Sequence, residues 1–183
     1  MPNKRDKFIN IPKPSPPKMP TKSAKALAYH QKGLLAEAQE IYLDILKTQP
    51  KHFDSLHLLG VIAHQTKNSQ LAVELIGKAI KLNPGVAEAH YNLGNALSAL
   101  GKCDETISSY NQAIQLKPDY FEAYNNLGNT LNQLGKFKEA VPYFTQAIQL
   151  KPGYFDAHYN LANALYGLGR REEAILSYTE AIK

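Results

Sequence analysis

Cysteine is almost absent from this chain of 183 residues, and long apolar runs are absent altogether. The single cysteine, Cys103, excludes a framework of internal disulfide bonds. No apolar stretch approaches the roughly 18 residues that a membrane-spanning helix requires. The first 22 residues are basic but lack the apolar segment of a secretory signal. We therefore expect a cytoplasmic protein without a membrane partner.

Motifs for catalysis and metal binding are missing as well. The sequence contains no glycine-rich phosphate loop, no CxxC pair and no HExxH. His57 and His64 lie seven residues apart, but neither is followed by a carboxylate or cysteine at three or four residues that could complete a metal site. We expect no catalytic residue, no metal and no cofactor within these residues.

The charge is concentrated at one end of the chain. The first 22 residues contain six basic residues and one acidic residue, which accounts for the whole net charge of +5. Nucleic-acid binders carry a basic stripe on their folded surface, and here the remaining residues are balanced in charge. Residues 1–20 also hold six of the eleven prolines, a composition that buries too little apolar surface to fold. We expect a disordered basic tail over 1–20 and no nucleic-acid partner.

The rest of the chain has an internal period. Proline recurs every 34 residues from Pro50 to Pro152, and glycine recurs with the same period from Gly101 to Gly169. A fixed period of this length indicates a repeat architecture. Each unit contains two apolar patterns of helical spacing, separated by the glycine and closed by the proline, which ends a helix. Because the connection is short, the two helices must be antiparallel, and the sequence predicts an all-α fold.

Small residues occupy fixed positions in these units. Gly60, Gly94 and Gly128 fall in the middle of the first helix, where glycine costs about 1 kcal/mol relative to alanine. The repetition of this cost indicates that the second helix of the unit approaches closely at this point. We expect Leu127 and Gly128 to lie at such a contact.

The order of Leu-Gly in the first helix, then Ala, an aromatic residue, Ala and a closing Pro in the second, resembles the tetratricopeptide repeat family. The resemblance implies a right-handed superhelical solenoid over residues 21–183, whose first helices line a concave inner surface. Its units would be a weak repeat at 19–52, full repeats at 53–86, 87–120 and 121–154, and an incomplete repeat at 155–183. The repeated asparagines are similar to the asparagine ladder in the repeat arm of O-linked N-acetylglucosamine transferases.

One stripe of the first helices is expected to face this concave surface, on the basis of side chains placed at 100° intervals. The stripe is rich in tyrosine and amides and has acidic residues at its edge. It consists of Glu88, Tyr91, Asn92, Asn95, Glu122, Asn125, Asn126, Asn129, Asp156, Tyr159, Asn160 and Asn163.

Six of these asparagines form two predicted rows. Asparagine is a poor helix former, and its amide both donates and accepts hydrogen bonds, which suits the backbone of an extended peptide. We expect all six to be accessible and free of intramolecular bonds, so that alanine at three of them leaves folding intact. The alternative is that recent duplication copied harmless surface residues. The rows are Asn92, Asn126 and Asn160, with Asn95, Asn129 and Asn163 beside them.

Three functions fit these features. The first is a non-catalytic protein–protein interaction module that binds extended peptide segments in the concave groove. Its acidic edge disfavours binding of acidic C-terminal tails, because like charges repel. The second is the N-terminal substrate-selecting arm of a larger enzyme, such as a glycosyltransferase. The third is a self-associating scaffold.

The last unit has no following helix in this sequence. We expect Ile175 and Ile182 to lie on a surface that lacks its next helix. The chain would then continue past Lys183, or another chain would cover this end, and self-association through it is a possible outcome.

Overall fold

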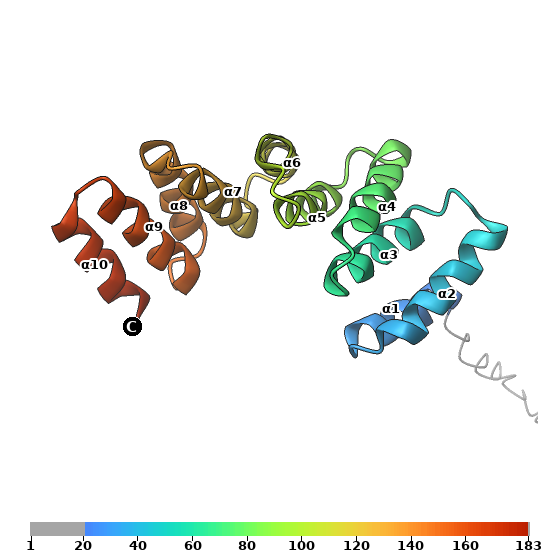
Figure 1. Ribbon diagram of the computed structural model, residues 1–183. Helices are drawn as coiled ribbons and strands as arrows, with labels where there is room; N and C mark the ends of the chain where they lie inside the picture. The colour runs from blue at the N-terminus through green and yellow to red at the C-terminus, as the bar shows by residue number, and fades with distance from the viewer. Residues whose placement is uncertain (1–20, 183) are drawn as a thin grey trace, which may run out of the picture.

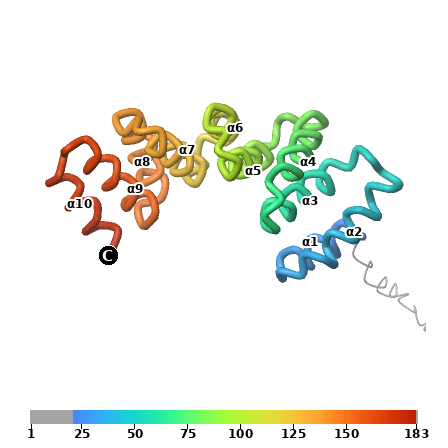
Figure 2. The backbone as a smooth tube through the Cα atoms, in the orientation of Figure 1, coloured from blue at the N-terminus to red at the C-terminus, as the bar shows by residue number. Residues whose placement is uncertain are grey.

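A computed structural model describes residues 21–182, and within that range it contains ten helices and no strand. The tail predicted for residues 1–20 lies outside the described residues. The helices form five consecutive antiparallel pairs that together make an arc (Figures 1 and 2). In chain order the pairs are α1 (Lys22–Gln31) with α2 (Leu35–Thr48), α3 (Phe53–Gln65) with α4 (Ser69–Leu82), α5 (Ala87–Ser98) with α6 (Cys103–Leu116), α7 (Phe121–Gln133) with α8 (Phe137–Leu150), and α9 (Phe155–Gly167) with α10 (Arg171–Ala181). The predicted all-α solenoid of helix pairs is confirmed.

A residue in the left-handed conformation closes the first helix of each pair. Gly101 has φ +70°, and the N–H of the next residue, Lys102, bonds to the carbonyl of Leu97 at 3.1 Å. This bond satisfies a carbonyl that the helix end would leave unpaired. The second pair uses Lys67 at the same position with φ 67°, although a side chain at this conformation costs roughly 1–2 kcal/mol. The turn therefore depends on backbone geometry that glycine adopts more easily.

The mid-helix glycines lie where the two helices of a pair approach each other. A Cβ on Gly128 would lie 2.7 Å from the ring of Phe144 in α8, and one on Gly94 would lie 2.5 Å from Tyr110 in α6. Phe144 and Leu127 are fully buried, in one apolar cluster with Tyr110. The expectation that Leu127 and Gly128 lie at the helix-pair contact is thus confirmed.

The first helices lie on the inner side of the arc. α3 contacts α5 and α7 contacts α9 across neighbouring pairs, and no two second helices within 21–182 are in comparable contact. The stack therefore curves toward the first helices, which agrees with the positions of α3 and α5 below α4 and α6 in Figure 1. The surface available to a ligand inside the curve is made mainly of first-helix side chains.

Candidate functional site

Hydrogen bonds join the first helices at a spacing of 35 residues. The Nδ2 of Asn92 donates to the Nε2 of His57 at 2.9 Å. One pair further along, the Nδ2 of Asn126 donates to the hydroxyl of Tyr91 at 3.2 Å. The third joint repeats this register, since the Nδ2 of Asn160 donates to the Oδ1 of Asn125 at 3.0 Å. Each asparagine of the first row thus connects its helix to the preceding first helix.

The middle joint is the most densely bonded. Asn126 donates a second bond to the Oδ1 of Asn95 at 3.1 Å, and the same oxygen accepts the hydroxyl of Tyr110 at 2.8 Å. Burial raises the pKa of Tyr110 well above its usual value, so the hydroxyl keeps its proton and remains a donor. The last pair repeats part of this arrangement, because the hydroxyl of Tyr178 donates to the Oδ1 of Asn163 at 2.6 Å.

These bonds correct two expectations from the sequence. Asn125 is only 4% exposed, so it belongs to the contact between helices and is not an open groove residue. The six asparagines of the two rows were expected to be free of intramolecular hydrogen bonds. This expectation is wrong for five of them. Neighbouring first helices are offset along their axes. A side chain therefore lies beside the residue 35 positions later in the sequence, one more than the repeat length of 34, and this brings the amides within hydrogen-bonding distance. The five are Asn92, Asn95, Asn126, Asn160 and Asn163.

The network leaves part of this polar surface unbonded. Asn129 is exposed, and within residues 21–182 its side chain has no hydrogen-bond partner. The side-chain oxygens of Asn92 and Asn160 accept no bond from the described chain, and the Nδ2 of Asn163 donates none there. All three residues are partly exposed. The amides are therefore held at one end by the fold and open at the other.

Aromatic rings and lysines form a second feature beside the amides. The ring of Tyr91 lies 4.8 Å from that of Tyr120, and the amino group of Lys117 lies 4.5 Å above Tyr120. The next unit repeats this with Lys151, which lies 4.4 Å above the ring of Phe121, and with the edge contact of Phe121 and Tyr154 at 5.0 Å. Sequence reasoning missed Tyr120, Tyr154 and the two lysines, although the recurrence of Lys-Pro at 117–118 and 151–152 was a usable signal.

Acidic side chains occupy the second residue of α3, α5, α7 and α9. Glu88 pairs with Lys117 at 3.3 Å, and the pKa of Glu88 is lowered first by its own backbone N–H and then by this lysine. Glu122 and Asp156 form no ion pair with any described residue.

Two tyrosines lie close to these acidic side chains. Burial raises the pKa of Tyr154, which is close to Asp156, to about 12, so its hydroxyl stays neutral. The predicted groove residue Tyr159 is 46% exposed, stacks on Phe155 and lies in α9, the last of the first helices.

The chemistry of this surface is that of recognition by hydrogen bonds and ring contacts. Within 21–182 no group of three His, Cys, Asp or Glu side chains could hold a metal ion. No helix in that range is long and apolar enough to cross a bilayer. His57 is buried, and burial lowers its pKa, which keeps the ring neutral and able to accept the bond from Asn92.

Comparison with known families gives matches along nearly the whole described chain. One family model, described as TPR repeat, matches residues 94–135. Four models described as Tetratricopeptide repeat match residues 23–87, 75–107, 121–154 and 155–183.

Two curated relatives resemble shorter segments. The human Superkiller complex protein 3 is 38% identical over 71 residues, and the match covers 38% of this chain and 4% of the relative. The UDP-N-acetylglucosamine--peptide N-acetylglucosaminyltransferase of Caenorhabditis elegans is 37% identical over 75 residues, which cover 41% of this chain and 6% of the relative. The chain therefore spans only a small part of the length of these relatives.

Solved structures match over a larger share. The crystal structure of MamA protein superposes with a TM-score of 0.78 at 28% identity, and the match covers 86% of each chain. The crystal structure of YrrB, described as a TPR protein with an unusual peptide-binding site, has a TM-score of 0.75 at 22% identity. That match covers 88% of this chain and 83% of YrrB, and at this identity it shows a shared fold alone.

Proposed function

Because the chain belongs to the tetratricopeptide repeat family, we propose that it is a non-catalytic interaction module that binds an extended peptide segment along its concave face. The observation that carries this proposal is the set of amides that are bonded at one end and open at the other. Three of them, Asn92, Asn160 and Asn163, have their orientation fixed by bonds to neighbouring side chains. A ligand that bonds to their open ends does not need to order them first, which lowers the entropic cost of binding.

The spacing of the helices suits an extended chain. Neighbouring packed helices lie roughly 8–10 Å apart, and an extended peptide advances about 3.3 Å per residue. One first helix would thus meet about every third residue of the ligand. Amide groups bond to peptide N–H and C=O groups, which every sequence contains. The amides would then provide affinity, and the side chains around them would provide selectivity.

Charge at the edge of the face sets the preferred ligand. Glu122 and Asp156 form no ion pair within 21–182, and Asp54 is exposed at the same repeat position. An acidic ligand would be repelled here, so we infer a neutral or basic segment. The partly exposed ring of Tyr91 adds a contact surface for an apolar side chain of the ligand. YrrB, which has a similar fold, is described as having a peptide-binding site, and this supports a peptide as the class of ligand.

The test begins with peptides selected from a random library on the full chain. Their affinity is then measured for the parent and for the double variant Asn129→Ala and Asn163→Ala. Each lost bond should weaken binding by about 0.5–1.5 kcal/mol, and the pair by roughly 1–3 kcal/mol. The matched control is Asn111→Ala, which removes an exposed amide from α6 on the other side of the arc. Equal affinities for the parent and the double variant would refute the proposal.

A second candidate function is the substrate-selecting arm of a glycosyltransferase. The 37% identity to a segment of the Caenorhabditis elegans enzyme favours it. The coding sequence downstream of Lys183 tests it directly, because a catalytic domain there is required and a stop codon would exclude it. A cytoplasmic location and a role as a self-associating scaffold are also proposals, and fractionation of cells and sedimentation of the purified chain test them.

A further inference from the structure

The outer face of the arc carries a groove of about 640 Å³ between α6 and α8. Its floor is formed by Leu127 and Leu131 of α7, which are buried. On a helical wheel these leucines lie on the side of α7 opposite to the concave stripe, so the groove is separate from the proposed peptide site. Its remaining lining is Ile107, Tyr124, Lys136, Glu139, Pro142, Tyr143 and Gln146.

Two charges that are paired in neighbouring units are unpaired in this groove. The residues equivalent to Lys136 and Glu139 in the helix pairs before and after form ion pairs of 3.0 Å and 2.6 Å. Lys136 and Glu139 themselves are exposed and form no ion pair with any residue in 21–182. Both charges are therefore available to a ligand. The equivalent ion pairs are Lys102 with Glu105 and Arg170 with Glu173.

Two tyrosines replace residues that bond to their own unit elsewhere in the repeat. Tyr124 stands where α5 and α9 have histidines, whose Nε2 atoms donate to the carbonyls of Pro84 and Pro152 at 2.9 Å and 2.7 Å. Tyr143 stands where α6 and α10 have serines, whose hydroxyls donate to a carbonyl of their own helix. Both tyrosines are partly exposed, and their hydroxyls have no hydrogen-bond partner in the described part of the chain. The groove thus has two free donors.

A proline inside α8 lines the same groove. Pro142 is exposed and lies beyond the first turn of the helix, where proline costs about 3 kcal/mol relative to alanine. The equivalent residues in α6 and α10 are Ser108 and Leu176, so the repeat itself does not require this proline. It adds a rigid apolar edge to the groove at the expense of the helix.

We propose that this groove binds the segment 13–18 of a second copy of the chain, KPSPPK, in the polyproline conformation. Pro-rich segments in this conformation dock in grooves lined by aromatic side chains. Proline has a carbonyl but no N–H, so the segment presents mainly acceptors, which match the donors of Tyr124, Tyr143 and Lys136. Its two lysines match the free carboxylate of Glu139.

The same segment of one chain does not reach its own groove. Lys18 precedes Lys22, the first residue of α1, by four residues, which span at most about 14 Å. The groove lies on α7, three first helices further along the arc, and packed helices are roughly 8–10 Å apart. Its distance from α1 is therefore about 24 Å or more. A second copy supplies the segment instead.

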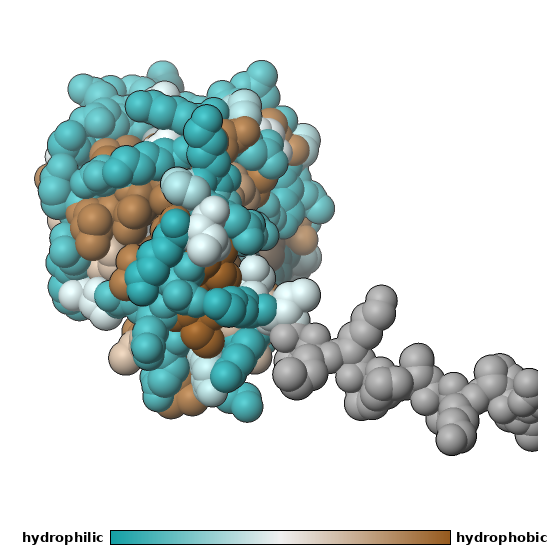
Figure 3. Space-filling view, turned by 90° about the vertical axis from the view of Figure 1, so that its right-hand side faces the viewer, coloured by the Kyte–Doolittle hydropathy of each residue, from teal (hydrophilic) through white to brown (hydrophobic). Residues whose placement is uncertain are grey.

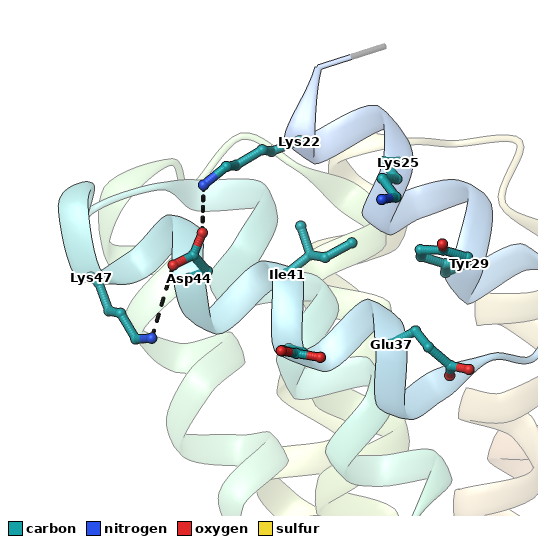
Figure 4. Close-up of a pocket in the computed structure, with 8 residues that line it drawn as sticks. Lys22, Lys25, Tyr29, Glu37, Ile41, Asp44 and Lys47 are labelled. Atoms are coloured by element: carbon teal, nitrogen blue, oxygen red, sulfur yellow. Dashed lines mark hydrogen bonds and ion pairs between the residues drawn. The ribbon is translucent and has the colours of Figure 1, made fainter. Parts of the chain in front are cut away.

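Two other cavities do not fit this segment. The α1–α2 end of the arc is mainly hydrophilic (Figure 3). In its groove of about 420 Å³, Lys22 and Lys47 pair with Asp44, and a third lysine lies over the one aromatic ring of the lining (Figure 4). The cavity on the α9–α10 pair includes Ile175 and Ile182, whose expected exposure is confirmed at 63% and 81%. No carboxylate lines that cavity, so it offers no partner for the lysines of the segment.

The probe is a fluorescently labelled peptide with the sequence of residues 10–20, titrated with the full chain and followed by anisotropy. We expect saturable binding that Glu139→Lys weakens about tenfold or more, because a lysine there repels the lysines of the peptide. Glu105→Lys is the matched control, since Glu105 is exposed at the same position of α6 but does not line the groove. Its affinity should stay within twofold of the parent. Tyr143→Ser, which introduces the residue of the neighbouring units, should weaken binding about fivefold or more.

Two further measurements test the polyproline conformation and the second copy. A peptide in which Pro14, Pro16 and Pro17 are replaced by alanine keeps the charge and should bind about fivefold more weakly or worse. The full chain should self-associate in sedimentation equilibrium, and Glu139→Lys should reduce this association while Glu105→Lys does not.

Four outcomes overturn the proposal. They are no saturable binding of the peptide, equal losses with Glu139→Lys and Glu105→Lys, equal binding of the alanine peptide, and a full chain that stays monomeric above the Kd of the peptide. Peptides selected for the concave face should bind the Glu139→Lys variant as tightly as the parent. Failure of the outer groove is therefore distinguishable from failure of the proposed function.

Discussion

Replacement of Gly128 by alanine tests the close contact between the helices of a pair. An alanine Cβ would lie 2.7 Å and 2.8 Å from two ring carbons of Phe144, whose side chain is fully buried, so the ring or one of the helices must shift. Alanine in a helix interior gains about 1 kcal/mol over glycine. Overpacking of a core costs typically about 1–3 kcal/mol. The net expectation is a loss of roughly 0–2 kcal/mol in the free energy of unfolding.

Gly77→Ala is the matched control for this experiment. Gly77 lies inside α4, and a Cβ there would meet nothing within 4 Å. The same helix gain then acts alone, and the variant should be more stable by about 1 kcal/mol, which raises the Tm by roughly 2–4 °C. Thermal unfolding followed by circular dichroism at 222 nm compares the two (a wavelength of about 222 nm reports helix content).

The difference between the two variants decides the matter. The structure predicts that the free energy of unfolding of Gly128→Ala is lower than that of Gly77→Ala by roughly 1–3 kcal/mol. Shortening the opposing ring with Phe144→Leu should make Gly128→Ala less costly than it is in the parent, which gives a coupling energy between the two positions. If Gly128→Ala raises the Tm as much as Gly77→Ala does, the helices do not approach closely at this position.

Three further predictions concern the core, the amide network and a buried histidine. Leu127→Ala should cost roughly 2–5 kcal/mol in urea unfolding, because the side chain is fully buried, and a cost below 1 kcal/mol would contradict its position in the core. Asn126→Ala removes two donated bonds and one accepted bond and should cost roughly 1–3 kcal/mol, whereas Asn129→Ala should stabilise by a few tenths of a kcal/mol; similar melting points would count against the network. Burial lowers the pKa of His57, so the unfolded chain binds more protons below about pH 6.5 and stability falls from pH 7.5 to 5.5. His57→Gln should reduce that fall, and an unchanged pH profile would show that His57 does not contribute to it.

The helix pairs could be predicted from the sequence because their signals are local. The period of Pro50 and its equivalents and the turn glycines each depend on the conformation of a few neighbouring residues, and the mid-helix glycines report a contact within one helix pair. Even Lys67, which departs from the turn pattern, adopts the same left-handed conformation, because the bonds around it are the same as in the other turns.

The bonding of the asparagines could not be predicted in the same way. Placement on a helical wheel indicates the direction of a side chain from its own helix axis, but it contains nothing about the stagger of the next helix. That stagger brings Asn126 to Tyr91 and Asn160 to Asn125, with a sequence separation of 35 residues. The repeat period alone predicts contacts between residues that are 34 positions apart. The observed separation of 35 residues arises from the way in which the helices pack.

The repeated asparagines were interpreted either as ligand-binding groups or as surface residues copied by duplication, and these two interpretations are compatible in part. Duplication would copy Asn92 to Asn126 and Asn160, but bonds between units give each copy a structural role that an arbitrary surface residue would lack. Replacement of these three residues by alanine is expected to damage the fold, contrary to the prediction from sequence. A test of ligand binding must consequently use the amides that the network holds least, above all Asn129.

The most direct test of the account is an NMR titration of the full chain with a selected peptide. The side-chain amide signals of Asn92, Asn129, Asn160 and Asn163 are followed, with the exposed amide of Asn111 in α6 as the reference for the opposite surface. A peptide bound along the concave face should shift the first four signals in proportion to occupancy and leave Asn111 unchanged. Shifts at Asn111 and at the α9–α10 end, with the four concave amides unmoved, would contradict the proposed groove.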